Sequence, residues 1–350
     1  MLGLQPATLE RRQEPSAPGG VRDWTGGGMP RWLTCLIAFL ALGFGLQILP
    51  VLAAEPESRV AVTTTGMVAD IVRRIGGSRL SVEELIGSGV DPHLYKPTRS
   101  DIARLASAGI VFYSGLLLEG KLSSALERLA EAGRPVHAVT ELLDKSYLLM
   151  PPDFHGHPDP HVWMDPGAWA KTVDVVYQKL VQFDPEGESY FLTNADTLRA
   201  DLLALDTYAN EVLSSVPAES RVLVTAHDAF RYFSRRYDFE VVGIQGISTD
   251  SEAGLQDIEG IVTLLVNRRI GAIFVESTVS DRNAQALMAG ARARGQSVQI
   301  GGQLYSDAMG APGTYEGTYT GMMDHNVTVI ARALGGKAPE RGMSGKLAIK

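Results

Sequence analysis

Cysteine is almost absent from this chain, which has a single one, Cys35, among 350 residues. Cys35 lies early in an apolar run, and Thr34 directly precedes it, so the pattern does not match the small residue that precedes a lipidated cysteine. If the apolar run is removed on export, the mature chain has no cysteine. Disulfides and thiolate ligation of a metal are then excluded, and any metal site must use His, Asp or Glu.

An excess of positive charge is also lacking. The chain has 32 Lys and Arg against 40 Asp and Glu, a formal net charge of −8, and a sequence pI of about 5.4. Nucleic acids and anionic membrane surfaces attract cationic faces, so we expect neither as a partner. Hydrophobic residues make up 45% and charged residues 21%, which is ordinary for a globular protein with a sizeable core.

The N-terminal segment has the composition of a leader rather than of a folded domain. Residues 1–28 are rich in Gly, Pro and Arg, and we interpret them as disordered or wrongly included. Residues 29–54 combine Arg31, an apolar run and the small pair Ala53 and Ala54, which is typical of a secretory signal peptide. Translation then starts at Met1 or Met29, and the protein is exported to the periplasm. Because the apolar run is about 20 residues long, an uncleaved membrane anchor is the alternative.

The remaining chain alternates short β-rich apolar runs with helical patterns. Strands that alternate with helices indicate parallel sheets with helices on both faces. The predicted strands are 58–65, 81–87, 110–115, 135–139, 221–226, 239–244, 271–277 and 297–305. The predicted helices are 67–77, 97–109, 121–133, 167–183, 185–216, 229–237, 252–269, 281–295 and one over roughly 314–336.

The helical stretch 185–216 divides this alternation into two series. About 30 residues at about 1.5 Å each span roughly 45 Å, which is long for a helix within one domain. We therefore predict an α/β protein with two parallel-sheet lobes joined by a long rigid helix and a cleft between them. The expected domains are an N-terminal lobe over 55–183, a linking helix over 184–217 and a C-terminal lobe over 218–350.

Four potential metal ligands follow predicted strands. His93 and His161 each end a DPH triplet and precede a helix, His227 directly follows the strand 221–226, and Asp307 follows 297–305. In open α/β sheets, ligands bind at the carboxyl ends of the strands. Imidazole and carboxylate together suit Zn²⁺, and they also suit Mn²⁺.

Each feature also has a structural explanation. A DPH triplet can be only a turn whose Asp caps the following helix, and a histidine after a strand is often a hydrogen-bonding residue. His155 and His157 flank a glycine in a Pro-rich loop and are expected to be solvated. His137 falls inside a predicted strand and His325 inside a predicted helix. The coincidence of four candidates across two lobes favours a metal site.

At these residues the chain resembles the periplasmic metal-binding proteins of zinc and manganese ABC transporters, the cluster A-I solute-binding proteins. The resemblance extends from about residue 58 to 338. It is carried by five segments: DPHLYKPTRSD (91–101), DPHVWMDP (159–166), VTAHDAFRYFSRRY (224–237), IFVES (273–277) and LYSDAMG (304–310).

The resemblance implies two lobes joined by a rigid helix, with one divalent metal ion, Zn²⁺ or Mn²⁺, held between them by His93, His161, His227 and Asp307. Family members with Glu in place of His227 are associated with manganese. Zinc importers often carry a long His-rich loop, of which His155 and His157 are a short remnant that at most helps to gather metal.

The implied function is to capture the metal outside the cytoplasmic membrane and deliver it to an ABC permease. We expect a monomer without catalytic residues. Because a ligating imidazole usually donates its other N–H to an oxygen, Asp91, Asp159, Asp228 and Glu276 are candidates for that supporting role. The alternatives are a metal-binding surface adhesin or buffer, and a secreted zinc hydrolase. The hydrolase is disfavoured because four protein ligands leave no open position, and because the sequence has no H-E-x-x-H or G-x-S-x-G segment.

Overall fold

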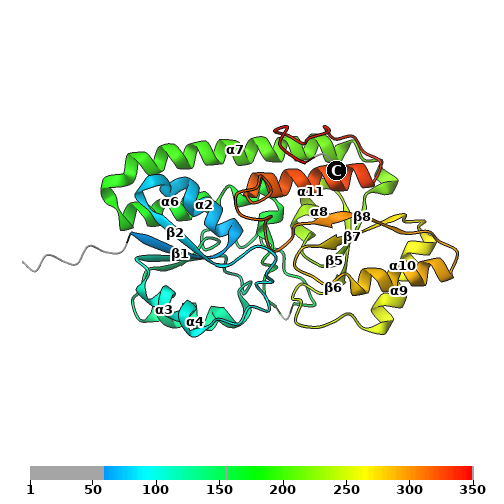
Figure 1. The fold of residues 1–350 in the computed structure, drawn as a ribbon, viewed down its shortest axis with the longest axis horizontal. Coiled ribbons are helices and arrows are strands. Elements are labelled where there is room, and N and C mark those ends of the chain that lie inside the picture. The colour runs from blue at the N-terminus through cyan, green and yellow to red at the C-terminus, as the bar shows by residue number, and fades with distance from the viewer. Residues whose placement is uncertain (1–58, 155, 349–350) are drawn as a thin grey trace, which may run out of the picture. The chain divides into compact units, whose positions relative to one another are not determined.

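The computed structural model describes residues 59–154 and 156–348 (Figure 1). The predictions for the leader 1–28, for the signal segment 29–54 and for His155 lie outside the described residues. Within the described ranges, no helix is both long and apolar enough to cross a membrane.

The N-terminal lobe is built on a four-stranded parallel sheet with strand order β2-β1-β3-β4. Helices cover both faces of this sheet. In β1 (Val60–Thr65), Ala61 packs in one hydrophobic cluster with α2 (Gly66–Gly76), and the next residue, Val62, packs in another with α3 and α4. This arrangement matches the predicted parallel α/β lobe. Its other elements are β2 (Ser81–Ile86), β3 (Ile110–Tyr113), β4 (Val136–Ala138), α3 (Arg99–Ser107), α4 (Ser123–Glu131), α5 (Pro166–Trp169) and α6 (Thr172–Phe183).

The C-terminal lobe contains two parallel strand pairs, β5-β6 and β7-β8, with β5 against β7. Helices α9 and α10 pack on one side of these strands around Ile273, while α8 and α11 pack on the other around Phe274. The elements are β5 (Val222–His227), β6 (Glu240–Gln245), β7 (Ala272–Glu276), β8 (Gln299–Leu304), α8 (Arg231–Tyr237), α9 (Leu255–Asn267), α10 (Arg282–Ala293) and α11 (Tyr319–Ala333).

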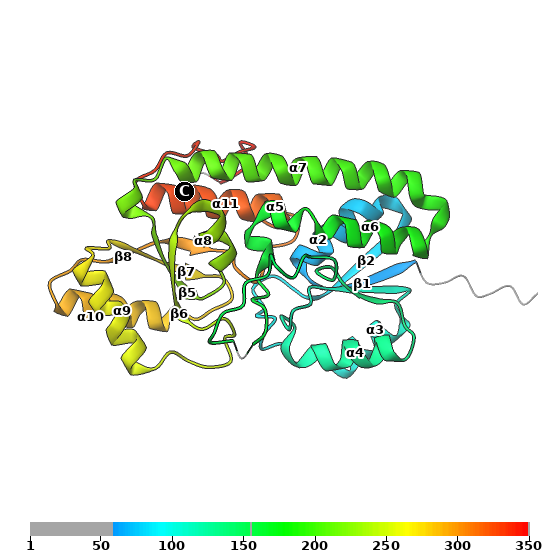
Figure 2. The same cartoon turned by 180° about the vertical axis from the view of Figure 1, so that it is seen from behind.

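The long helix α7 (Glu188–Ser214) runs along both lobes, as Figures 1 and 2 show from opposite sides. It contacts α2, α5 and α6 of the first lobe and α8 and α11 of the second. Buried residues recur along it every three or four positions, which places one apolar stripe against the lobes. These residues are Phe191, Ala195, Leu198, Leu202, Leu205, Ala209 and Leu213. One hydrophobic core therefore continues from lobe to lobe beneath α7.

Two predicted helices differ from the structure more than the others do. The helix predicted over 167–183 is divided into α5 and α6, because the hydroxyl of Thr172 donates to the carbonyl of Trp169 (2.7 Å) and competes with the helical pattern. The last helix begins at Tyr319 instead of near 314, and Thr318 caps it by accepting the amide of Gly321. Residues 314–318 form turns instead.

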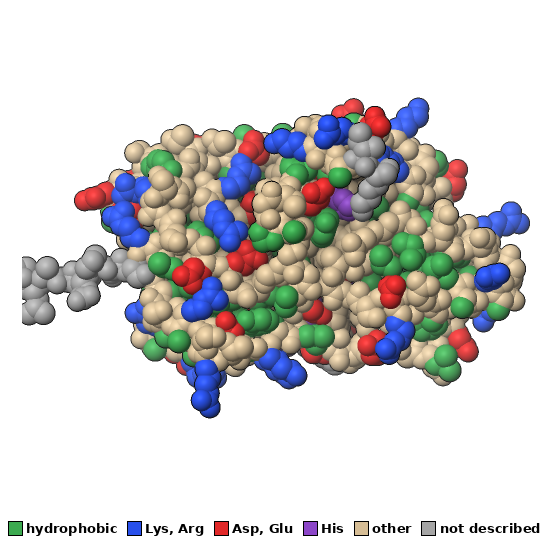
Figure 3. All heavy atoms as spheres, viewed as in Figure 1, with side chains coloured by type: hydrophobic (Ala, Val, Ile, Leu, Met, Phe, Trp, Pro, Cys, Tyr) green, Lys and Arg blue, Asp and Glu red, His purple; other side chains and the backbone are tan. Residues whose placement is uncertain are grey.

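Charged side chains of both signs are interspersed over the face seen in Figure 3. On that face, the described residues form no broad patch of one sign. This distribution matches the near balance of acidic and basic residues in the composition.

Candidate metal centre

Four buried side chains meet between the lobes: His93, His161, His227 and Asp307. One potential ligand atom from each lies within 4.8 Å of those of the other three. Two of the residues come from each lobe, His93 and His161 from the first and His227 and Asp307 from the second. The structure thus brings together the four residues that the sequence analysis selected.

Strand ends explain why they meet. His227 is the last residue of β5, and Asp307 lies three residues after the end of β8 at Leu304. His93 follows β2 in the loop that leads to α3, and His161 precedes the 3-10 turn Val162–Met164. Because all paired strands are parallel, their carboxyl ends collect at one edge of each sheet.

The Nε2 atoms of the three imidazoles face the Asp307 carboxylate. Nε2 of His227 lies 3.1 Å from Oδ2, Nε2 of His93 lies 3.4 Å from Oδ2, and Nε2 of His161 lies 3.4 Å from Oδ1. The Nε2 atoms of His93 and His161 are 3.3 Å apart. Three imidazole nitrogens and one carboxylate oxygen can supply the four ligands of a tetrahedral zinc site.

Several of these atoms are buried without a hydrogen-bond partner among the described residues. They are Nε2 of His227 and both carboxylate oxygens of Asp307. An unsatisfied buried polar atom costs roughly 1–3 kcal/mol, and more when it is charged. A divalent cation placed among the four side chains would satisfy all of these atoms at once, so the residues present fit a metal ion.

Glu276 fixes the orientation of His227. This carboxylate ends β7, beside β5, and its Oε2 lies 2.5 Å from Nδ1 of His227. Its Oε1 accepts the backbone amide of the same histidine at 2.9 Å. A carboxylate acceptor at Nδ1 retains the proton there and leaves the Nε2 lone pair directed into the site.

Asp159 holds His161 in the same way. Its Oδ1 lies 2.8 Å from Nδ1 of His161 and accepts the His161 amide at 2.9 Å. The Tyr232 hydroxyl, from α8 of the other lobe, donates to the Asp159 carbonyl at 2.9 Å. The second DPH triplet is therefore both a turn and a support for the imidazole.

Asp91 and Asp228, the other two candidates for imidazole support, contact other groups instead of a histidine ring. Asp91 accepts the backbone amide of His93 (2.8 Å) through Oδ1 and the hydroxyl of Thr249 (2.5 Å) through Oδ2. The first DPH triplet thus forms an Asx turn without a contact to the ring. Asp228 pairs with Nε of Arg231 at 2.5 Å, within α8 and the turn before it.

The electrostatics of the site differ between its members. Burial lowers the pKa of His93 to about 3, so this imidazole is neutral at physiological pH. Burial also opposes the charged form of His227, but the carboxylates of Glu276 and Asp307 outweigh it and raise its pKa well above the usual value. Burial raises the pKa of Asp307, yet His227 and His161 more than reverse this and hold it below its usual range.

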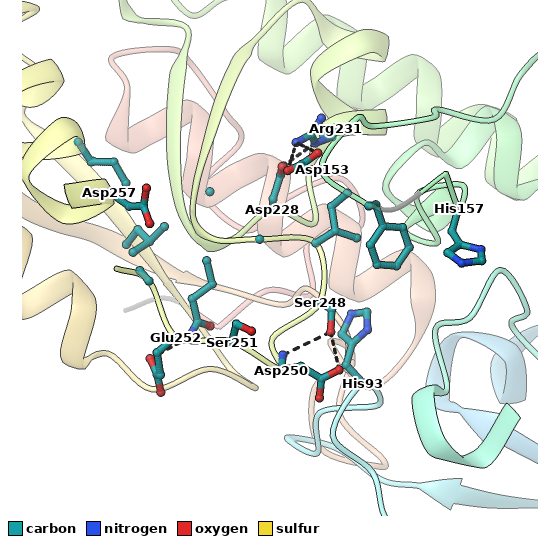
Figure 4. Close-up of a pocket in the computed structure, with 18 of the residues that line it drawn as sticks. His93, Asp153, His157, Asp228, Arg231, Ser248, Asp250, Ser251, Glu252 and Asp257 are labelled. Atoms are coloured by element: carbon teal, nitrogen blue, oxygen red, sulfur yellow. Dashed lines mark hydrogen bonds and ion pairs between the residues drawn. The ribbon is translucent and has the colours of Figure 1, made fainter. Parts of the chain in front are cut away.

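A cavity of about 1010 Å³ opens beside His93. Figure 4 shows His93 in this cavity near Ser248 and Asp250, with Asp153, Arg231 and Asp228 joined by ion pairs at another part of its wall. The cavity wall includes His157, which is exposed and separate from the four-residue cluster.

Two further described histidines, His137 and His325, lie outside the cluster. His137 lies half-buried in β4, with its ring centroid 6.0 Å from that of Phe112. Nε2 of His325, within α11, is 2.9 Å from the carbonyl oxygen of Gln303. Thr249 and Tyr232, which contact the DPH loops from the other lobe, were not selected from the sequence, because no local pattern there distinguishes them from ordinary loop and helix residues.

Comparison with known proteins identifies the family. Residues 61–333 match the family model described as zinc-uptake complex component A, periplasmic. The chain belongs to this family. It is 44% identical over 283 residues to the manganese-binding lipoprotein MntA of Bacillus subtilis, covering 81% of this chain and 91% of that protein. It is 43% identical to the zinc-binding protein TroA of Treponema pallidum, with the same two coverages of 81% and 91%.

The fold agrees with a solved structure of this family. The periplasmic zinc-binding protein TroA of Treponema pallidum superposes with a TM-score of 0.76 at 44% identity. The alignment covers 79% of this chain and 98% of the TroA chain. The two α/β lobes and the long helix are therefore the fold of this family.

Proposed function

We propose that the protein captures one divalent transition metal ion, Zn²⁺ or Mn²⁺, outside the cytoplasmic membrane and delivers it to an ABC permease for import. The observation that carries this proposal is the buried cluster of three imidazoles and one carboxylate, in which Nε2 of His227 and both oxygens of Asp307 lack a hydrogen-bond partner among the described residues. The names of MntA and TroA support it, because they describe a manganese-binding and a zinc-binding protein.

His93, His161 and His227 bind the metal through Nε2, and Asp307 binds it through its carboxylate. Glu276 and Asp159 hold two of the imidazoles in the binding tautomer. Because the four ligands come from two lobes, a small displacement of a loop or lobe opens the coordination sphere. This property suits a carrier protein that must release its bound metal ion.

The donor set is compatible with both metals. Zinc binds imidazole nitrogen together with carboxylate oxygen in a tetrahedron, and manganese accepts imidazole beside carboxylate and water. A given site of this kind binds divalent zinc more tightly than manganese. The metal that is loaded in the cell therefore depends on the supply of each ion as well as on affinity.

A hydrolase function is disfavoured by the same geometry. Catalytic zinc sites usually have three protein ligands and an open position for water. Here four protein ligands enclose the space, and His161, His227 and Asp307 are at most 1% exposed. We therefore propose a binding protein, not an enzyme. We also propose that it acts as a monomer in the periplasm.

Calorimetric titration of the metal-free protein with Zn²⁺ and with Mn²⁺ tests this proposal. The wild type should bind one ion per chain. His227→Ala should lose tight binding, whereas His157→Ala, on the wall of the neighbouring cavity, should bind like the wild type. Unchanged affinity in the His227→Ala variant would show that the cluster is not the binding site.

A further inference from the structure

The four residues of the candidate metal centre are not held equally. His161 and His227 have 0% of their surface exposed and Asp307 has 1%, whereas His93 has 4% and lines the cavity shown in Figure 4. His93 is thus the member of the cluster beside open space.

Buried hydrogen bonds between the lobes hold the segment that carries His161 against the second lobe. The indole N–H of Trp163 donates to the carbonyl of Ser306 (2.9 Å), next to Asp307. The hydroxyl of Tyr319 donates to the carbonyl of Trp163 (2.6 Å), and Tyr232 donates to the carbonyl of Asp159. Trp163, Tyr232 and Tyr319 also belong to the core shared by both lobes. His161, His227 and Asp307 therefore form one rigid block.

The loop that carries His93 is attached differently. Val90 and Leu94 of this loop are 40% and 47% exposed. Within the described chain, two hydroxyl groups connect the loop with the second lobe: Ser88 donates to the carbonyl of Met309 (2.9 Å), and Thr249 donates to Oδ2 of Asp91 (2.5 Å).

The Thr249 hydrogen bond is connected through Asp91 to the candidate ligand His93. The other oxygen of the Asp91 carboxylate, Oδ1, accepts the backbone amide of His93 at 2.8 Å. Asp91 thus joins a hydroxyl of the second lobe to the backbone of His93. A hydrogen bond to a carboxylate is stronger than one between neutral groups, so this connection restrains the loop more than its single donor suggests.

We propose that the Thr249–Asp91 hydrogen bond is a latch that holds His93 on the metal, and that His93 is the first ligand to leave when the metal is released. This inference rests on the proposed metal-binding function. Thr249 is a positioning residue, because it acts through Asp91 and does not touch the metal. Loss of the latch frees the His93 loop while the block of the other three ligands remains in place.

The test is the rate at which the full chain, loaded with Zn²⁺ or Mn²⁺, loses its metal to excess chelator in a stopped-flow experiment. Thr249→Val removes the hydroxyl and retains the shape of the side chain. We expect it to dissociate about tenfold faster, which corresponds to about 1.4 kcal/mol. Thr249→Ser keeps the donor and should release metal at nearly the wild-type rate.

Two control variants separate a latch from general attachment of the lobes. Ser251 lies on the same loop as Thr249, is exposed and lines the cavity, so Ser251→Ala should not change the rate. Ser88→Ala removes the other hydroxyl that connects the His93 loop with the second lobe. Because Ser88 donates to the carbonyl of Met309 and not to Asp91, this variant should change the rate less than Thr249→Val.

Three results would overturn the latch. They are a wild-type dissociation rate in Thr249→Val, a Thr249→Ser variant as fast as Thr249→Val, and an equal acceleration in Ser88→Ala. These outcomes differ from failure of the proposed function, in which the wild-type chain would bind neither Zn²⁺ nor Mn²⁺ in the calorimeter.

Discussion

Asp70 offers a test of how burial affects the stability of this fold. The residue lies on α2 with 9% of its surface exposed, near the beginning of α11. Burial raises the pKa of its carboxyl to about 6 from 3.8, and the nearby Arg74, the backbone amide of Tyr319 and Arg73 only partly oppose this. The folded state therefore binds the Asp70 proton more tightly than the unfolded state does.

The sign of the pH effect follows from this difference. Protonated Asp70 favours the folded state, so its contribution is fully present below about pH 3.8 and is lost as the pH rises through about 6. The shift from 3.8 to about 6 corresponds to about 3 kcal/mol, at about 1.36 kcal/mol per pKa unit. Asp70→Asn has no such proton to lose and keeps a neutral side chain of similar size.

Urea unfolding of the metal-free wild type and of Asp70→Asn should therefore give free energies that diverge with pH. Between about pH 4 and pH 7, the wild type should lose 2–3 kcal/mol more than the variant, by an estimate on the order of the pKa shift. About 0.5 M salt should leave most of the divergence, since burial is not screened as surface charge is. Parallel curves for the two proteins would show that burial does not hold a proton on Asp70 in the folded state.

Two further predictions concern the support of the site and the joining helix. Glu276→Gln should bind metal about 10–100-fold more weakly in calorimetry, because His227 loses its carboxylate partner. The control Glu252→Gln, on the cavity wall, should bind metal with wild-type affinity. Equal affinities in the two variants would contradict the role of Glu276. Leu205→Ala, fully buried in α7, should lower the free energy of unfolding by about 2–5 kcal/mol. Leu203→Ala, 53% exposed on the same helix, should change it by less than about 0.5 kcal/mol, and similar losses in both would contradict the buried stripe.

The sequence predicted the alternating fold well because each strand is a short apolar run bounded by turn residues. It also selected His93, His161, His227 and Asp307, since parallel strands place their carboxyl ends together. Helix boundaries were less accurate, because side chains such as Thr172 and Thr318 set them through individual hydrogen bonds.

The supporting contacts were predicted only in part. Glu276 and Asp159 do contact ring nitrogens, but Asp91 and Asp228 have other partners. Both DPH triplets have the same sequence, yet only Asp159 reaches the imidazole of its own triplet. The difference depends on contacts from the second lobe, from Tyr232 in one case and Thr249 in the other, and local sequence does not encode them.

We propose that one metal ion binds between the three imidazoles and Asp307. A crystal structure of the zinc-loaded or manganese-loaded protein, with anomalous diffraction at the metal edge, tests it most directly. For the zinc-loaded protein we expect one peak at about 2.0–2.2 Å from Nε2 of His93, His161 and His227 and from the Asp307 carboxylate. A metal ion bound elsewhere, such as at His157, with this cluster empty, would contradict it.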